Sequence, residues 1–206
     1  MRELVIATAA ALLACAGARA PRDVTGTVGG APFAPVEVVA FRAGPATCGA
    51  FPFGIQLSAV GLALAGFDGA CTYVTSAACV MARGTSAVVL VVGKAGASAA
   101  AAALGPGEYQ VFPDVQQLLV AAVGGAGVGA SHTADVACRA PARRATGKVT
   151  ITAIDGSHVA GRLDVTLEGG GALNGSFDAP LCPAAPDVCS VLLAGGDVCP
   201  AGLSCR

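Results

Sequence analysis

The fold is decided by the stretch Ala145–Cys182, which reads ATGKVTITAIDGSHVAGRLDVTLEGGGALNGSFDAPLC. Apolar and polar residues alternate within three of its segments, Gly147–Ala153, Gly161–Glu168 and Leu173–Asp178. An Asp-Gly pair separates the first two segments, and a run of three glycines separates the last two. Since successive side chains of a strand point to opposite faces, this period of two predicts three strands with one buried face. The glycine-rich turns join them into an antiparallel meander.

Further short β-prone segments precede the meander. Among them Ala87–Val92 carries no polar residue, so we expect a strand that is buried on both faces. Ala97–Ala103 fits either one or two helical turns or a flexible loop, and Gly124–Gly129 fits a loop or a glycine-softened strand. Together the segments predict an all-β fold, an antiparallel β-sandwich or barrel-like domain. The expected upstream strands are Val24–Val28, Val36–Phe41, Gly54–Val60, Ala87–Val92, Glu108–Phe112, Gln117–Val123 and Ala134–Cys138.

The composition is apolar but does not indicate a membrane-spanning helix. Of the 206 residues 54% are hydrophobic and 12% are charged, with a mean hydropathy of +0.70. A spanning helix needs roughly 18–20 continuous apolar residues, and no internal run reaches that length. The net charge is −1 and the basic residues do not cluster. Because a nucleic-acid partner requires a positive face, the sequence argues against nucleic-acid binding.

The N-terminus predicts export. Leu4–Leu13 is an apolar run of the length of a signal-peptide core. The sequence Leu12-Leu13-Ala14-Cys15 that ends it resembles the lipobox of bacterial lipoproteins, which implies that Cys15 becomes the acylated, palmitate-bearing first residue and anchors the chain to a membrane. In that family a residue other than Asp after the cysteine, here Ala16, goes with transfer to the outer membrane. The alternative is cleavage after Ala18 and release as a periplasmic or secreted protein.

The cysteines support an oxidising compartment. Nine are present, and setting Cys15 aside leaves eight, an even number that favours four disulfides. Two pairs are close in sequence. Cys71 and Cys79 enclose the strand-like segment Thr72–Thr75 and could staple a tight hairpin, and Cys199 with Cys205 could close a small loop. The absence of C-x-x-C argues against zinc or a redox-active pair. The cysteines with expected but unassigned disulfide partners are Cys48, Cys71, Cys79, Cys138, Cys182, Cys189, Cys199 and Cys205.

Three regions follow from these patterns. Residues 1–20 form the signal peptide and lipobox region, and residues 21–182 form the β domain. Residues 183–206 form a cysteine-rich tail in which prolines and glycines exclude long regular elements. We expect this tail to be tied by disulfides, either packed on the β domain or beside it.

Two parts of the chain resemble a known type of protein. They are Thr25–Phe33 (TGTVGGAPF) and the meander from Gly147 to its end in Gly175–Cys182 (GSFDAPLC). Both resemble uncharacterised exported lipoproteins of GC-rich Gram-negative bacteria, especially of the myxobacterial kind. The resemblance implies a lipid-anchored β domain and carries no catalytic residues.

Few residues offer chemistry. The two histidines lie near carboxylates, in the pairs His132 with Asp135 and Asp155 with His158, and could form a metal site only if the fold joined the two segments. For both pairs the default interpretation is solvated surface residues.

Other catalytic patterns are incomplete. Ser131 and Ser176 lack the G-x-S-x-G setting of a nucleophilic serine. Asp164 and Asp178 could supply a carboxylate pair on one polar face, but both fit ordinary solvent-facing positions. Gly124–Gly129 lacks the Lys-Ser/Thr ending of a phosphate loop.

We therefore expect a non-enzymatic cell-envelope lipoprotein domain, without a cofactor or metal, that binds or scaffolds an envelope protein or extracellular ligand. One alternative is a secreted inhibitor or small-ligand binder that uses the tail Pro183–Arg206 for recognition. Another is a metal-dependent or serine hydrolase, the metal form built on the two histidine–carboxylate pairs.

Overall fold

The described part of the chain folds into twelve strands and one short helix. The computed structural model describes residues 23–46, 56–75, 79–98, 100–113, 126–134, 144–183 and 203–205. The elements are β1 (Thr25–Val28), β2 (Ala31–Phe33), β3 (Glu37–Ala46), β4 (Gln56–Ala65), α1 (Ala70–Thr75), β5 (Cys79–Met81), β6 (Ala87–Gly96), β7 (Gly107–Phe112), β8 (Ala126–Ala134), β9 (Ala145–Ile154), β10 (His158–Leu167), β11 (Gly171–Pro180) and β12 (Leu203–Cys205).

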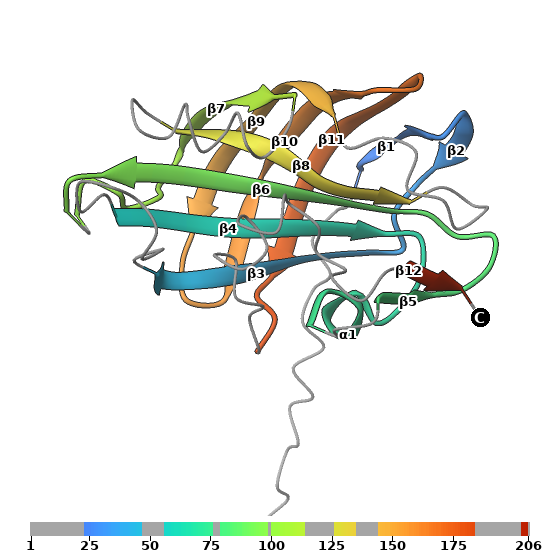
Figure 1. Cartoon of the computed structure of the whole chain (residues 1–206), viewed down its shortest axis with the longest axis horizontal. Helices are drawn as coiled ribbons and strands as arrows, with labels where there is room; N and C mark the ends of the chain where they lie inside the picture. The colour runs from blue at the N-terminus through green and yellow to red at the C-terminus, as the bar shows by residue number, and fades with distance from the viewer. Residues whose placement is uncertain are drawn as a thin grey trace, which may run out of the picture.

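Ten of the strands form one sheet (Figure 1), in the order β2-β1-β11-β10-β9-β7-β8-β6-β4-β3. Neighbouring strands are antiparallel except for β7 and β8, which run parallel. The all-β expectation is confirmed, and so is the meander, because β9, β10 and β11 pair consecutively and antiparallel. The two turns of the meander lie between β9 and β10 and between β10 and β11, at the two glycine-containing segments that predicted them.

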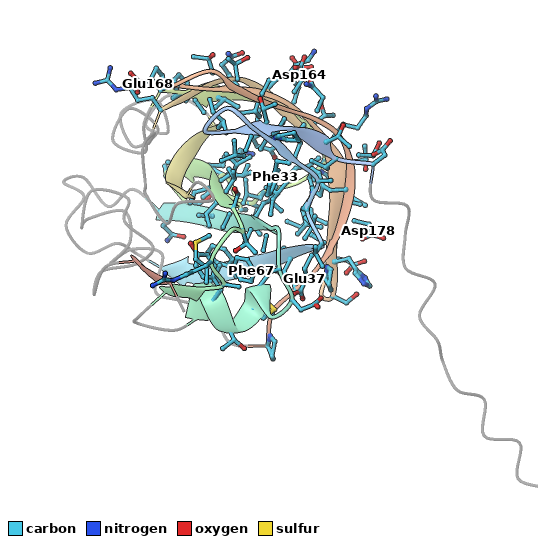
Figure 2. The ribbon with its side chains drawn as sticks, turned by 90° about the vertical axis from the view of Figure 1, so that its right-hand side faces the viewer. Phe33, Glu37, Phe67, Asp164, Glu168 and Asp178 are labelled. Atoms are coloured by element: carbon cyan, nitrogen blue, oxygen red, sulfur yellow. A yellow bond between two sulfur atoms is a disulfide. The ribbon has the colours of Figure 1, made fainter. Side chains whose placement is uncertain are left out.

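The sheet curls around a single core. Viewed from its side, it curves around an interior that contains Phe33, while Asp164 and Glu168 lie on the outside (Figure 2). An isolated bridge between Ala40 and Leu181 joins β3 to the chain that leaves β11, and the Cys182 N–H donates to the Ala40 carbonyl at 2.7 Å. The interior is filled by apolar side chains from nine of the ten strands of the sheet, and this burial is the main stabilising term of the fold.

Three strands are buried on both faces over part of their length: β3 at Val38–Phe41, β4 at Ala59–Ala65 and β6 at Ala87–Val92. Val88 and Leu90 belong to the interior core, whereas Val89 and Val91, which alternate with them, are equally buried on the opposite face. The helix α1 contacts β3 and β4 and lies outside the curve of the sheet (Figure 2). The prediction for Ala87–Val92 is thus confirmed: a strand without polar residues can be covered on both sides.

The structure corrects one prediction about the cysteines. The segment Thr72–Thr75 forms part of helix α1 rather than a strand, and Cys71 bonds to Cys182 instead of stapling a hairpin with Cys79. The helix begins where the Glu37 carboxylate accepts the N–H groups of Gly69 and Ala70, at 2.6 and 2.8 Å. These contacts satisfy donors at the helix start that have no partner within the helix.

Two ambiguous segments are resolved. Within the glycine-rich segment Gly124–Gly129, residues 126–129 belong to strand β8, so the described part of this segment is a strand and not a loop. Within Ala97–Ala103 the Ala102 N–H donates to the Ser98 carbonyl at 2.9 Å, as in a single helical turn.

Several predictions fall outside the described residues. They concern the leader with Cys15, the strand Gln117–Val123 and all but the first residue of Ala134–Cys138, as well as Cys48, Cys138, Cys189 and Cys199. Of the tail, β12 pairs in parallel with β5. In the described part of the chain, no helix has both the length and the apolar character needed to cross a membrane.

Candidate functional site

The outward side of β9, β10 and β11, here called the meander face, carries the polar residues that alternate with the buried apolar ones. Lys148, Asp164 and Asn174 lie side by side across the three strands, because Asp164 pairs with both of the others in the register. All three are exposed. Their inward neighbours Val149 and Leu163 are buried in the core, which fixes the outward residues in place.

A second row of polar residues lies next to the first. Arg162 pairs with Thr150 on β9 and with Ser176 on β11. Arg162 precedes Asp164 by two residues on the same strand, so both side chains leave the same face of β10. The meander face therefore presents a guanidinium and a carboxylate at neighbouring positions.

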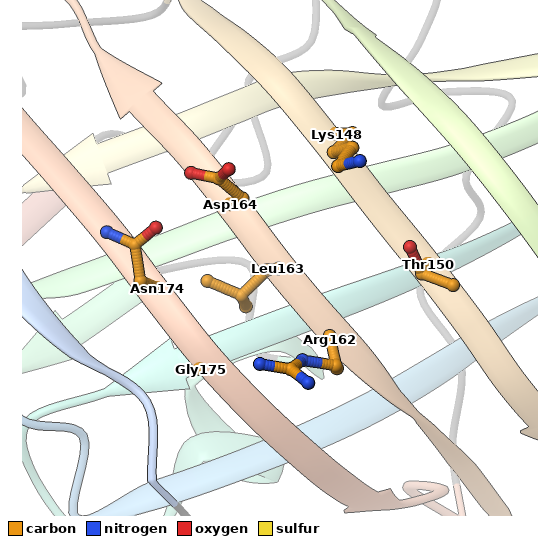
Figure 3. A pocket seen from close by; sticks show the side chains of 7 residues that line it. All are labelled: Lys148, Thr150, Arg162, Leu163, Asp164, Asn174 and Gly175. Carbon is orange, nitrogen blue, oxygen red and sulfur yellow. The ribbon is translucent and has the colours of Figure 1, made fainter.

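Between the two rows the surface is hollowed into a depression of about 350 Å³. Figure 3 shows the Arg162 guanidinium extending from β10 toward Gly175 on β11, with Asp164 and Asn174 further along. We call this hollow the Arg162 depression; its lining residues are Lys148, Thr150, Arg162, Leu163, Asp164, Asn174 and Gly175.

Gly175 adjoins the first described residues of the chain, Asp23 and Val24. Its φ of 138° lies in a region that other residues rarely adopt, and a Cβ there would overlap the Asp23 carbonyl and come within 2.6 Å of the Val24 Cα. The Asp23 carboxylate accepts the N–H of Ser176. The glycine thus permits the first described residues to pack directly against β11, beside the depression.

The charged groups of the depression differ in whether they have partners. Lys148 Nζ lies 3.1 Å from Glu108 Oε2, a surface ion pair in which both side chains are at least half exposed. Arg162, Asp164 and Asn174 form no side-chain hydrogen bond or ion pair anywhere in the described structure. A guanidinium donor, a carboxylate acceptor and an amide with both functions are therefore free to contact a ligand.

The Asp155–His158 segment forms a tight turn that is held by hydrogen bonds to the Asp155 carboxylate. Asp155 Oδ1 accepts the N–H groups of Ser157 and His158, at 2.6 and 2.9 Å, and the Ser157 hydroxyl at 2.8 Å. The N–H of Ser157 contributes most to lowering the pKa of Asp155 from 3.8 to about 2, followed by the N–H of His158 and the hydroxyl. Ser157 Oγ also lies 3.1 Å from His158 Nδ1, so the hydroxyl contacts both the carboxylate and the imidazole within this turn.

The fold does not bring the two histidines together. His132 lies in β8, three residues beyond Gly129, which pairs with Phe112 at the end of β7. That end of the sheet holds the last residues of β10, whereas His158 begins β10 at the opposite end, across from Pro180. Asp135 lies outside the described residues. Across the residues that are described, no three His, Cys, Asp or Glu side chains converge as a metal site requires.

The carboxylates Asp164 and Asp178 are too far apart for glycoside cleavage. Asp164 pairs with Asn174, so Asp178 stands four residues further along β11, roughly 13 Å away at about 3.3 Å per residue. The carboxylate pairs of glycosidases are closer, up to about 9.5 Å. Asp178 Oδ1 is buried without a hydrogen-bond partner, while Ser176 is held through its backbone by Asp23. The side chain of Ser131 is not described.

Comparison of the chain with protein-family models, with curated proteins and with solved structures finds no match.

Proposed function

We propose that this chain is an exported lipoprotein, anchored through Cys15 in the outer membrane, whose β domain binds or scaffolds a component of the cell envelope without catalysis. The observation that carries the binding role is the Arg162 depression. There Arg162, Asp164 and Asn174 stand around one hollow without partners among the described residues. A free charge that folding does not use is a group available for recognition.

The strand that carries Arg162 and Asp164 is held firmly in the sheet, which favours a role in recognition. β10 pairs with β11 from His158 to Leu167, and with β9 from Val159 to Leu167 with one register shift at Ala160. Its inward residues Val159, Leu163, Val165 and Leu167 are all buried. A face carried on such a strand is preorganised, so ligand binding does not have to order it.

The disulfide supports an extracytoplasmic location. Cys71 and Cys182 are 111 residues apart and join α1 to the end of the meander. Disulfides of this kind persist in oxidising compartments such as the periplasm and are rare in the cytosol. The signal-peptide pattern at Leu4–Leu13 and the even number of cysteines after Cys15 agree with that location.

The anchor is tested by comparing the wild type with Cys15→Ser in the bacterium that produces the protein. We expect the wild type to incorporate labelled palmitate and to stay in the membrane fraction, and the variant to lose both properties. Cys71→Ser is the matched control, since it removes a cysteine of the β domain and should keep the label. A Cys15→Ser chain that remains acylated would contradict the anchor, and an unlabelled, soluble wild type would favour a secreted binder.

A further inference from the structure

We propose that the Arg162 depression binds the head group of a zwitterionic phospholipid, an ammonium joined to a phosphate, so that the meander face lies against the membrane that holds the anchor. This proposal rests on the proposed anchoring at Cys15. It names the ligand of the same depression.

The position of the depression is the first argument. The first described residue after Cys15 is Asp23, whose carboxylate accepts the N–H of Ser176, and the next residue, Val24, is only 3% exposed. Gly175, packed against these two residues, lines the depression. Cys15 precedes Asp23 by eight residues, so an acylated Cys15 lies within about 29 Å of Asp23 even if the link is fully extended. The depression is therefore held within reach of the head groups.

The pairing of charges is the second argument. Arg162 and Asp164 leave the same face of β10 two residues apart, about 7 Å along the strand. A guanidinium binds a phosphate through two parallel hydrogen bonds, and a carboxylate accepts from an ammonium. Because ethanolamine joins its ammonium to the phosphate through two carbons, one head group can reach both side chains. Asn174, directly opposite Asp164, can accept from the same ammonium.

The same arrangement disfavours ligands of a single charge. A simple anion at Arg162 is repelled by the unpaired Asp164, and a simple cation at Asp164 is repelled by Arg162. Lys148, the second cation at the depression, is already paired with Glu108. The site therefore selects for opposite charges on one small molecule.

The surface favours a polar contact over insertion into the bilayer. Val36 is the one large hydrophobic residue that is exposed within the described ranges, and it lies between β2 and β3 rather than in a strand of the meander. The net charge of −1 provides no general attraction to an anionic surface. Specific contacts with head groups are the remaining means by which this face can meet the membrane.

The test uses the mature lipidated chain in a detergent without phosphate, titrated with glycerophosphoethanolamine and followed by NMR at the amides of β9–β11. We expect shifts centred on Arg162 and Asp164. Glycerol 3-phosphate and ethanolamine should each bind the wild type at least about tenfold more weakly than glycerophosphoethanolamine does. The variants Arg162→Gln and Asp164→Asn should bind glycerophosphoethanolamine at least about tenfold more weakly than the wild type does. Arg144→Gln is the control, because Arg144 is also exposed but lies outside the depression.

Two results would overturn the head-group assignment. One is the absence of glycerophosphoethanolamine binding by a chain that carries its acyl groups, which would leave the anchor itself standing. The other is equal or tighter binding of glucuronate, which would assign the depression to acidic sugars. Since Arg162 and Asp164 are exposed and unpaired within the described structure, their variants should melt as the wild type does, and a loss of binding is then not a loss of folding.

Discussion

Phe177 on β11 lies directly opposite Gly161 on β10, and its ring covers the space that a side chain on Gly161 would fill. The ring carbon Cζ stands 2.9 Å from the position of a Cβ on that glycine. The same relationship recurs on the other face of the sheet, where the buried Phe41 on β3 lies opposite Gly61 on β4 and its ring occupies the space above the glycine. Cross-strand pairs of this kind stabilise a sheet through side-chain packing.

The first prediction concerns this packing. Gly161→Ala should lower the free energy of unfolding by roughly 1–3 kcal/mol, because the added methyl group meets both the Phe177 ring and the Thr150 carbonyl. Urea unfolding followed by circular dichroism measures the change. Gly156→Ala is the matched control, since nothing lies within 4 Å of its Cβ position. Equal stability of the two variants would contradict the close approach.

The second prediction concerns the Cys71–Cys182 disulfide. The double variant Cys71→Ser, Cys182→Ser should lose roughly 2–5 kcal/mol, because the bond closes a long loop and so restricts the unfolded chain. Amide hydrogen exchange in α1 should also accelerate, because without the disulfide only the contacts of the helix with β3 and β4 hold it against the large sheet. An unchanged urea midpoint together with unchanged exchange in α1 would show that the bond does not hold the helix.

The third prediction concerns Glu37, which caps α1 from β3. Glu37→Ala leaves the N–H groups of Gly69 and Ala70 without their acceptor and should cost about 1–3 kcal/mol, with Glu37→Gln in between. Glu168→Gln serves as the control: its 3.9 Å pair with Arg144 is exposed on both sides and should contribute about 0–1 kcal/mol. If both glutamates give the same small loss in thermal unfolding, Glu37 does not cap the helix.

The fourth prediction concerns pH. The pKa of Asp155 is lowered to about 2 in the folded chain, so its ionised form stabilises the turn above the ordinary value near 3.8. This stabilisation is lost as the pH falls from about 4 toward 2. Ser157→Ala removes the hydroxyl donor but keeps both N–H donors, so the pKa should rise and stay below 3.8. Carbon-detected NMR titration of the carboxyl group measures both values; an ordinary pKa in the wild type would be inconsistent with the turn.

The sequence alone predicts the elements whose signal is local. The meander follows from period-two alternation and glycine turns, and the burial of Ala87–Val92 follows from the absence of polar residues. Helix α1 cannot be predicted in this way. Its first turn depends on Glu37, more than thirty residues away, and the disulfide that attaches the helix to the meander depends on Cys182. The β-branched residues of Thr72–Thr75 indicate a strand when such contacts are unknown.

The candidate site was predictable in part. The outward positions of Arg162, Asp164 and Asn174 follow from the alternation. The depression itself does not, because it adjoins the contact of Asp23 with Ser176, which are 153 residues apart in sequence. Likewise, the sequence did not predict the parallel pairing of β7 with β8, which depends on the path of the chain between them.

The central claim, a disulfide-tied β domain anchored by lipid, is tested most directly by the intact non-reduced mass of the mature protein from its own host. The account predicts the mass of Cys15–Arg206 with three acyl chains and with the hydrogens of its eight remaining cysteines lost to four disulfides. A lipid-free chain that begins near Arg19, or a mass that retains the thiol hydrogens, would contradict it.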